Sequence, residues 1–266
     1  MMQTEEIVVS SNTLMSNTQT IANIAPSSSG EIRFWLGNNY VKADCDNVIS
    51  TQNCTGIGNQ TVKVAVIEHF RASLAILNIS SVDVKLNNFE MPIVDGSAKV
   101  WVENLSALKN QRSNKFYTIS EPIYFKKDKT EIIILPSDKF QLSYLVDFNH
   151  PDLTQRWVDF SEEKISEVIE ARTFGYLDDL EKLQSMGLAQ GVSLENTLGL
   201  KSDGGYTSDL RTEFEPAKHK MLDLIGDFYL SGINPFNMNI RVIAKQAGHA
   251  THVEVAKILK NKLKEV

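Results

Sequence analysis

Alternating and helical patterns of apolar residues divide the first part of the chain into short strands and helices. Residues 1–60 carry short apolar runs separated by turn residues, which predicts strands. The apolar spacing then changes to that of a helix, and we expect this helix to begin near Val66 and to end near Leu77. Residues 81–86 alternate cleanly, as a strand does, and 91–108 combine a turn with a second predicted helix.

A polar segment over 106–122 interrupts these patterns near the middle of the chain. Polar breaks of this kind are typical of the connections between domains. We therefore predict a first α+β domain over residues 1–110 and a second α+β domain over 111–266.

The second half repeats the mixture of strands and helices. The predicted strands are 131–136 and 140–148, and the predicted helices are 161–172, 176–187, 216–232 and 249–266. Ser161 suits an N-cap, Pro216 suits a first turn, and Gly187 and Gly232 follow helix ends. The predicted fold class is α+β, with helices packed on sheets.

Composition narrows the class of protein. The 266 residues carry a net charge of −6, from 27 basic and 33 acidic side chains, and 42% are apolar. An acidic chain of this kind argues against a nucleic-acid binder.

Two cysteines are too few for a disulfide scaffold or a four-cysteine zinc site. No apolar run approaches about 18 residues, so no membrane span is expected, and the N-terminus does not resemble a secretory signal. We predict a cytoplasmic protein.

The first chemical candidate is the segment HKMLD. His219 and Asp223 are four residues apart on a predicted helix and therefore share one face, and Asp227 continues that face one turn later. An imidazole nitrogen and a carboxylate oxygen are both zinc ligands. The same spacing also suits a solvated or locally hydrogen-bonded pair, so the segment alone does not decide between the two interpretations.

The second candidate is the pair Glu68 and His69 near the start of the first predicted helix. Adjacent helical residues point about 100° apart, so His69 could bind a metal while Glu68 acts as a general base. Two ligands from one helix and a third from the other domain leave a coordination position open, as in catalytic zinc sites. The alternative is a surface glutamate beside a buried, hydrogen-bonded histidine.

The third candidate is the segment AGHATH. His249 follows a glycine at a predicted helix start, from which an imidazole can act as a general acid or stabilise negative charge. His252 lies three residues later, and the alternative is that both simply occupy a helix start. His150 precedes a proline and is interpreted as structural. No phosphate-binding glycine loop, GxSxG elbow or HExxH motif is present.

Several of these segments, in this order, resemble the UDP-3-O-acyl-N-acetylglucosamine deacetylase family, the zinc amidases of lipid A biosynthesis. The matching stretches are 43–55, 66–79, 91–98, 148–151, 170–196, 210–232 and 247–250. Among them, ARTFG and HKMLDLIGDFYL are the most specific. The resemblance implies two similar layered α/β sandwich domains with the active site between them. It also implies hydrolysis of the N-acetyl group of a UDP-linked acylated amino sugar.

The resemblance also implies roles for individual residues. Its zinc ligands fall on His69, His219 and Asp223, and such a two-histidine, one-carboxylate set also suits Fe²⁺. The general base falls on Glu68, and the second catalytic residue falls on His249. The remaining implied residues are Asp227, which would orient His249; Thr173, near the scissile carbonyl; and the substrate contacts Lys220, Phe174, Tyr176, Phe148 and Cys54. No oligomeric state is predicted.

The chain departs from the family pattern at its start. The family carries a glycine- and histidine-containing GVGLHSG-like stretch where this chain has SSNTLMSNT over 10–18, with Met15 at the histidine position. The segment after GHA also differs, since THVEV replaces an asparagine-bearing sequence. Three hypotheses follow: the family deacetylase, a divergent paralogue that removes another N-acyl group, and a non-catalytic module that binds the precursor or a lipid.

Overall fold

The computed structural model describes residues 6–266, so part of the N-terminal prediction lies outside the described residues. The first half builds a five-stranded sheet in the order β1-β2-β8-β3-β4. Its strands are β1 (Ile7–Asn12), β2 (Gln19–Pro26), β3 (Ile32–Leu36), β4 (Asn39–Lys42) and β8 (Val82–Leu86). Only β3 and β8 pair in parallel, with Phe34 opposite Val84. Both side chains are fully buried, as the alternating pattern of these strands predicts.

The second half builds a five-stranded sheet with the same connectivity, β10-β11-β16-β12-β13. Its strands are β10 (Ile123–Lys127), β11 (Thr130–Pro136), β12 (Gln141–Val146), β13 (Arg156–Asp159) and β16 (Ile240–Lys245). Here β12 and β16 form the parallel pair, with Tyr144 opposite Ala244. The strand that comes last in sequence within each five-stranded sheet, β8 or β16, thus occupies the central position of that sheet. The predicted α+β class, with two similar halves, is confirmed.

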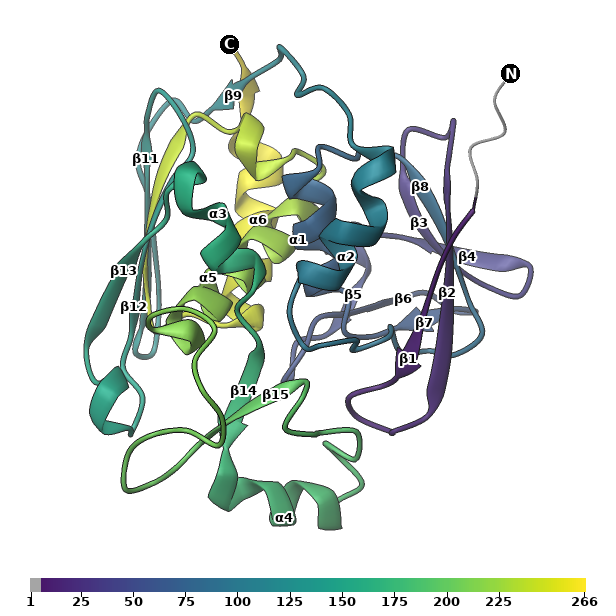
Figure 1. Cartoon of the computed structure of the whole chain (residues 1–266). Helices are drawn as coiled ribbons and strands as arrows, with labels where there is room; N and C mark the ends of the chain where they lie inside the picture. The colour runs from purple at the N-terminus through teal and green to yellow at the C-terminus, as the bar shows by residue number, and fades with distance from the viewer. Residues whose placement is uncertain (1–5) are drawn as a thin grey trace.

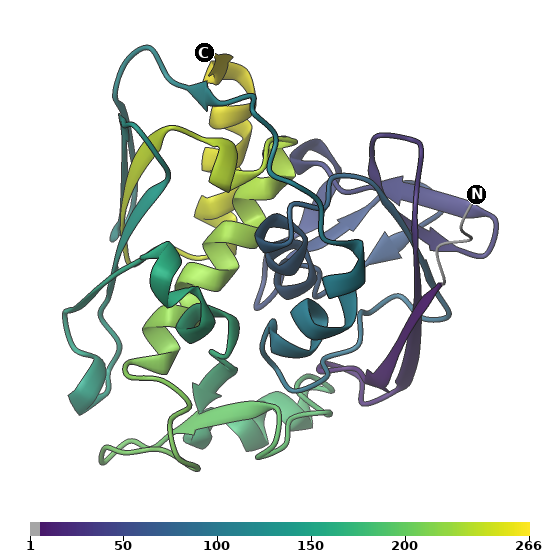
Figure 2. The ribbon, with the colours of Figure 1, turned by 45° about the horizontal axis from the view of Figure 1, so that its top comes forward.

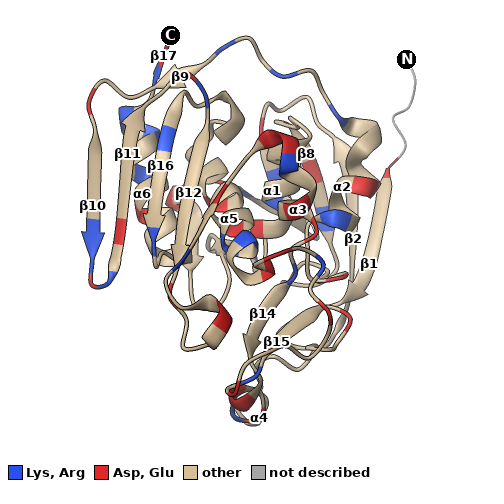
Figure 3. Ribbon diagram, turned by 60° about the vertical axis from the view of Figure 1, so that its left-hand side comes forward, with Lys and Arg blue, Asp and Glu red and all other residues tan. Residues whose placement is uncertain are grey.

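The two sheets form the outer layers of the molecule, and the helices other than α4 lie between them (Figures 1 and 2). The helices are α1 (Glu68–Ile76), α2 (Lys99–Leu105), α3 (Ile165–Ile169), α4 (Leu177–Ser185), α5 (Glu215–Phe228) and α6 (His249–Lys262). In the first half, α2 packs against β1, and Phe70 of α1 contacts Phe34 of β3. In the second half, α5 packs against β12 and β13, and His252 of α6 contacts Tyr144 of β12. The helix α5, which carries both acidic and basic positions, lies in the middle of the molecule (Figure 3).

Smaller elements complete the structure. The strands are β5 (Val48–Ser50), β6 (Gly56–Gly58), β7 (Lys63–Val64), β9 (Tyr117–Thr118), β14 (Thr173–Tyr176), β15 (Thr197–Leu200) and β17 (Lys264–Glu265). The short 3₁₀ helices are η1 (Cys45–Asn47), η2 (Ser106–Leu108), η3 (Pro151–Leu153), η4 (Glu162–Lys164), η5 (Tyr229–Ser231) and η6 (Pro235–Asn237). The parallel pair β14–β15 and α4 extend beyond the two sheets at one end of the molecule (Figure 1).

Two predicted helices are shorter than their sequence patterns indicate. The helix predicted over 161–172 is a 3₁₀ turn followed by α3, which ends at Ile169. It ends early because Arg172 turns away to bond the buried carboxylate of Glu215. The helix predicted over 249–266 ends at Lys262, and the residues after it pair with β9. Within residues 6–266, every helix is too short or too polar to cross a membrane.

Candidate metal and catalytic centre

The site forms where α1 of the first half crosses α5 of the second. Residue 226 is a glycine, and a Cβ at this position would lie 2.1 Å from the carbonyl oxygen of Glu68. The absence of a side chain therefore lets the backbones of the two helices approach each other closely. This contact brings the first turn of α1, with Glu68 and His69, against the middle of α5.

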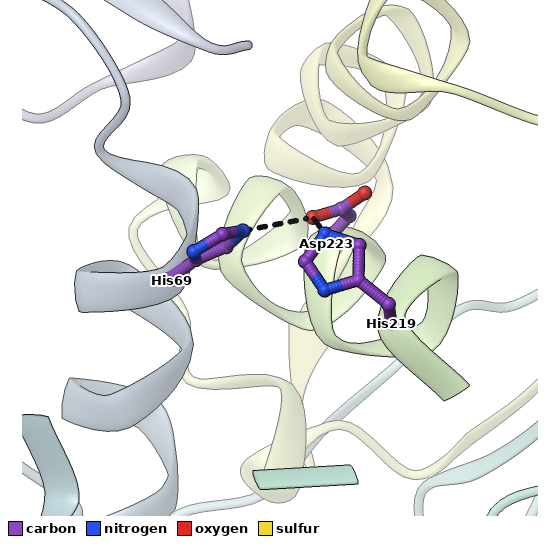
Figure 4. A group of neighbouring side chains, drawn as sticks. All are labelled: His69, His219 and Asp223. Carbon is purple, nitrogen blue, oxygen red and sulfur yellow. Dashed lines mark ion pairs between the residues drawn. The ribbon is translucent and has the colours of Figure 1, made fainter. Parts of the chain in front are cut away.

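Three side chains converge at this crossing. The Nε2 atoms of His69 and His219 lie 3.6 Å and 3.4 Å from Oδ1 of Asp223. Figure 4 shows both rings directed at this one oxygen, His69 from α1 and the other two residues from α5. The two imidazole rings meet edge to face, with centroids 4.8 Å apart. All three residues are buried.

The convergent atoms fit a divalent cation. Oδ1 of Asp223 is buried and has no hydrogen-bond partner among the described residues, which is a costly state for a carboxylate oxygen unless a cation binds it. Ligand atoms at about 2.1 Å around a tetrahedral ion lie about 3.4 Å apart, close to the separations found here. One ligand atom from each of the three residues can be chosen with all of them within 4.8 Å of one another.

The protonation of these residues also suits a cation. Burial lowers the pKa of His219 to about 4, so its imidazole is neutral at pH 7. Its Nδ1 lies 3.0 Å from the carbonyl oxygen of Ala171. Since a carbonyl only accepts, Nδ1 carries the hydrogen and Nε2 keeps a free lone pair. Burial alone would raise the pKa of Asp223, but Lys220, with Nζ 2.6 Å from Oδ2, and the histidines hold it well below its usual range.

Glu68 lies beside this group and faces His249. The backbone N–H of Thr55 donates to Oε2 of Glu68 at 3.0 Å, and Oε1 lies 4.0 Å from Nε2 of His249. Burial raises the pKa of the Glu68 carboxyl, which makes the carboxylate a stronger base than an exposed one. The gap between the two side chains leaves Oε1 free to take a proton.

Asp227 anchors His249 from behind. Its Oδ2 lies 2.9 Å from Nδ1 of His249, and its Oδ1 accepts a 2.6 Å hydrogen bond from the hydroxyl of Thr55. Burial alone would raise the pKa of Asp227, but the two neighbouring histidines lower it to about 2. Burial alone would lower the pKa of His249, but the carboxylates of Asp227 and Asp223 raise it to about 9. An imidazolium at position 249 therefore directs its Nε2–H toward the site.

A cavity of about 490 Å³ opens onto these residues and contains most of the predicted substrate contacts. Thr173, Phe174, Tyr176 and Lys220 line it, together with Glu68, His69, His219, Asp223 and His249. Its other walls are largely apolar and include Leu14, Val66, Leu180, Leu183, Leu188 and Val192. The cavity thus joins a polar, charged floor to an apolar passage, part of which α4 provides.

Two predicted substrate residues lie outside this cavity. Phe148 lines a neighbouring cavity of about 270 Å³, which also touches Phe174 and Lys220. The rings of Phe148 and Phe174 pack edge to face, 5.3 Å apart. Cys54 is buried in an apolar cluster with Leu14 and Val66, behind the cavity wall.

The altered N-terminal segment reaches the site. Met15 lies on the cavity wall, at the position where the family pattern has a histidine. Its backbone N–H donates to Oε1 of the buried Glu90 at 2.7 Å. Because position 15 is a methionine, the wall that the first half contributes to the cavity is apolar at this point.

The sequence patterns do not indicate the roles of three buried residues behind the site. Thr55 bonds both Glu68 and Asp227, although nothing in its local sequence marks it. The sequence suggests only a helix-start position for His252, yet this residue is fully buried with Nδ1 3.0 Å from Asp227. Tyr144 reaches His252 from a strand more than 100 residues away in the chain. For His252, the sequence offers one indication of this role: it lies three residues after His249 and therefore on the same side of the helix.

Comparisons with known proteins agree with this geometry. A family model described as UDP-3-O-acyl N-acetylglycosamine deacetylase matches residues 3–261. Curated proteins named UDP-3-O-acyl-N-acetylglucosamine deacetylase are similar to the chain. The one from Leptospira biflexa is 35% identical over 226 residues, covering 82% of this chain and 74% of the relative. The one from Trichormus variabilis is 31% identical over 259 residues, covering 91% of each. The chain therefore belongs to the UDP-3-O-acyl-N-acetylglucosamine deacetylase family.

Proposed function

We propose that the protein hydrolyses the N-acetyl group of UDP-3-O-acyl-N-acetylglucosamine in lipid A biosynthesis. Water adds to the acetamide carbon, the C–N bond breaks, and acetate and a free glucosamine amine result. The observation that carries this proposal is the convergence of Glu68 and His249 on the two sides of one cavity floor, beside the unpartnered oxygen of Asp223.

His69, His219 and Asp223 are the residues that would hold the metal. When bound, a divalent cation supplies Lewis acidity that polarises the amide carbonyl and lowers the pKa of water. The chemistry of two imidazoles and one carboxylate suits Zn²⁺, and it also suits Fe²⁺. We propose Zn²⁺ as the resident ion.

Glu68 acts as the general base. Its Oε2 is held by the N–H of Thr55, which leaves Oε1 to take the proton of the attacking water. Because burial raises the pKa of this carboxyl, proton transfer to it is more favourable than to an exposed glutamate. His249, opposite Glu68, can give its own proton to the leaving nitrogen, and the proton held by Glu68 can then restore His249.

His249 acts as the general acid and stabilises the negative charge that develops on the carbonyl oxygen. Its Nδ1 is bonded to Asp227, so Nε2 faces the cavity and can donate its hydrogen. Loss of one such donor typically lowers the rate by about 10²–10³-fold. Thr173 lines the same cavity, and we propose that its hydroxyl donates to the substrate near the scissile bond.

The cavity accounts for the rest of the substrate. Its apolar passage, whose lining includes Phe174 and Tyr176, suits the 3-O-acyl chain. Lys220 lines both cavities and can contact the polar part of the substrate, and Phe148 in the adjacent cavity can stack near the nucleotide. Cys54 would support the wall from behind rather than touch the substrate.

The test is acetate release and amine formation by the purified, metal-loaded protein on UDP-3-O-acyl-N-acetylglucosamine. We expect Glu68→Gln and His249→Gln each to lower kcat by at least about 10²-fold, with metal content unchanged. Lys257→Gln, on an exposed part of α6, serves as the control and should retain activity. Full activity in both site variants would refute the assignment.

A second candidate is a paralogue that removes a different N-acyl group. The observation that favours it is the apolar Met15 on the cavity wall, where the family pattern has a histidine. Metal-bound protein that is inert toward the lipid A precursor but hydrolyses another N-acyl amino sugar would support this candidate. Turnover of the precursor would eliminate it.

A further inference from the structure

We propose that His252 is a positioning residue for catalysis: together with Tyr144 it holds the Asp227 carboxylate, and through it the ring of His249, in the orientation that the reaction needs. This inference rests on the proposed function. It concerns two residues behind the site that do not line the cavity of about 490 Å³, although Tyr144 lines the neighbouring cavity. His252 stands one turn after His249 on α6, so both rings reach the same side of the helix.

Oδ2 of Asp227 is shared by two imidazoles. Nδ1 of His249 lies 2.9 Å from it and Nδ1 of His252 lies 3.0 Å from it. An ionised carboxylate can only accept, so both Nδ1 atoms carry a hydrogen. The hydroxyl of Thr55 occupies the other oxygen. The carboxylate is therefore held at both oxygens by three donors, and rotation about its Cβ–Cγ bond would break all three.

Tyr144 fixes the far side of the His252 ring. Its hydroxyl lies 3.1 Å from Nε2 of His252 and 2.7 Å from the carbonyl oxygen of Ala247. His252 and Tyr144 are both fully buried. The hydroxyl has a single hydrogen, which either the Ala247 carbonyl or Nε2 of His252 can accept. In both cases a ring flip would break the Nδ1–Asp227 bond and the contact of Nε2 with Tyr144.

This arrangement acts on the reaction through His249 alone. A fixed Asp227 holds Nδ1 of His249, and Nε2 of that ring then points to the gap between Glu68 and Asp223, at 4.0 Å and 3.8 Å. Without the His252 donor, Oδ2 keeps a single partner and the carboxylate can turn. Changes to such supporting residues typically cost about 10–100-fold in activity. The hydrogen bonds of the His252 ring go to Asp227 and Tyr144 rather than to the predicted metal ligands, so metal binding should be spared.

Four variants test the proposal. His252→Leu removes both ring nitrogens. His252→Asn keeps an N–H close to the Nδ1 position and therefore toward Asp227, whereas His252→Gln extends its amide toward Tyr144 instead. Tyr144→Phe removes only the hydroxyl that contacts His252. We expect His252→Leu and His252→Gln to lower kcat by about 10–100-fold with little change in KM. His252→Asn should recover most of the loss, and Tyr144→Phe should show a smaller loss.

A second measurement does not depend on turnover. The Nδ1–H of His249 should give a downfield proton resonance, protected from exchange by Asp227 and assigned by its absence in His249→Gln. We expect this resonance to be lost or exchange-broadened in His252→Leu and retained in His252→Asn. If the protein has no activity on the precursor, the proposed function fails while this resonance still tests the positioning of His249.

The results that would overturn the proposal are specific. Wild-type kcat and an unchanged His249 resonance in His252→Leu would do so, as would equal losses in His252→Asn and His252→Gln. If His252→Leu does not fold, the comparison of the Asn and Gln variants decides. Two metal equivalents in the wild type and one in His252→Asn would instead assign Asp227, His249 and His252 to a second metal site, and would also overturn it.

Discussion

Replacing Gly226 by alanine tests whether the close contact of α1 and α5 assembles the site. The new methyl carbon would lie 2.1 Å from the carbonyl oxygen of Glu68, 2.9 Å from its carbonyl carbon and 3.2 Å from the backbone nitrogen of Ala72. These neighbours are backbone atoms of a buried helix, so they cannot move aside as a flexible side chain would. The helices must separate instead.

The size of the separation follows from these contacts. Ordinary contact begins near 3.4 Å, so the methyl group and the Glu68 carbonyl must move apart by up to 1.3 Å. The distance from Nε2 of His69 to Oδ1 of Asp223 would then grow from 3.6 Å toward about 5 Å. Two ligand atoms bonded at about 2.1 Å to one ion cannot lie more than about 4.2 Å apart. We therefore expect a loss of at least about 10-fold in metal affinity.

The free energy of unfolding of Gly226→Ala should fall only modestly, because two effects on it oppose each other. Overpacking typically costs about 1–3 kcal/mol, whereas alanine in place of a helical glycine gains about 1 kcal/mol. The assays are metal content after dialysis against a competing chelator and the thermal unfolding midpoint of the metal-free protein. Gly175→Ala is the control, because a Cβ there meets nothing within 4 Å. Wild-type metal affinity in Gly226→Ala would refute the reasoning.

Three further predictions follow from the same structure. Removing the metal with a chelator should lower the unfolding midpoint, since a cation at 100 times its Kd stabilises the folded state by about 2.7 kcal/mol. In Asp223→Ala the metal should no longer raise the unfolding midpoint. A midpoint that still rises with metal in this variant would place the ion elsewhere. Thr55→Val should lower the free energy of unfolding by about 1.5–3 kcal/mol, because it removes the 2.6 Å hydrogen bond to Asp227. Thr55→Ser keeps the hydroxyl and should behave like the wild type in chemical denaturation. Equal stability of the two variants would contradict this prediction. Burial alone would raise the pKa of Glu215, but hydrogen bonds from Arg172 and a second arginine lower it. The ionised carboxylate therefore stabilises the folded state fully above its ordinary pKa of 4.5, and this stabilisation is lost as the pH falls through the lower pKa of the folded protein. Glu215→Gln should therefore cost about 3–5 kcal/mol at pH 7 and progressively less below pH 4.5, as measured by urea unfolding; a pH-independent difference would contradict the assigned pair.

Much of the local structure follows from short-range patterns. The helices predicted over 176–187 and 216–232 form nearly as expected, and Gly187 and Gly232 both adopt the left-handed backbone that ends a helix. The i, i+4 spacing of His219 and Asp223 predicts that they share one face of a helix, and they do. These features depend on residues within one or two turns of each other, so they can be predicted from the sequence alone.

Other features depend on partners distant in the chain. The helix predicted over 161–172 ends at Ile169 because Arg172 bonds Glu215, which is 43 residues away. The last predicted helix stops at Lys262 because the chain end pairs with β9. Periodicity carries no information about such contacts, since they form only when the two halves pack together.

The sequence by itself determined the fold class, most of the helices and strands, and the residue types able to carry the chemistry. Family resemblance added their expected roles. Only the tertiary structure decided that His69 meets Asp223, 154 positions away, and that Asp227 is held by Thr55 and His252. The physical reason is that a site between two halves is set by how closely their helices approach, and here that approach depends on the missing side chain of Gly226.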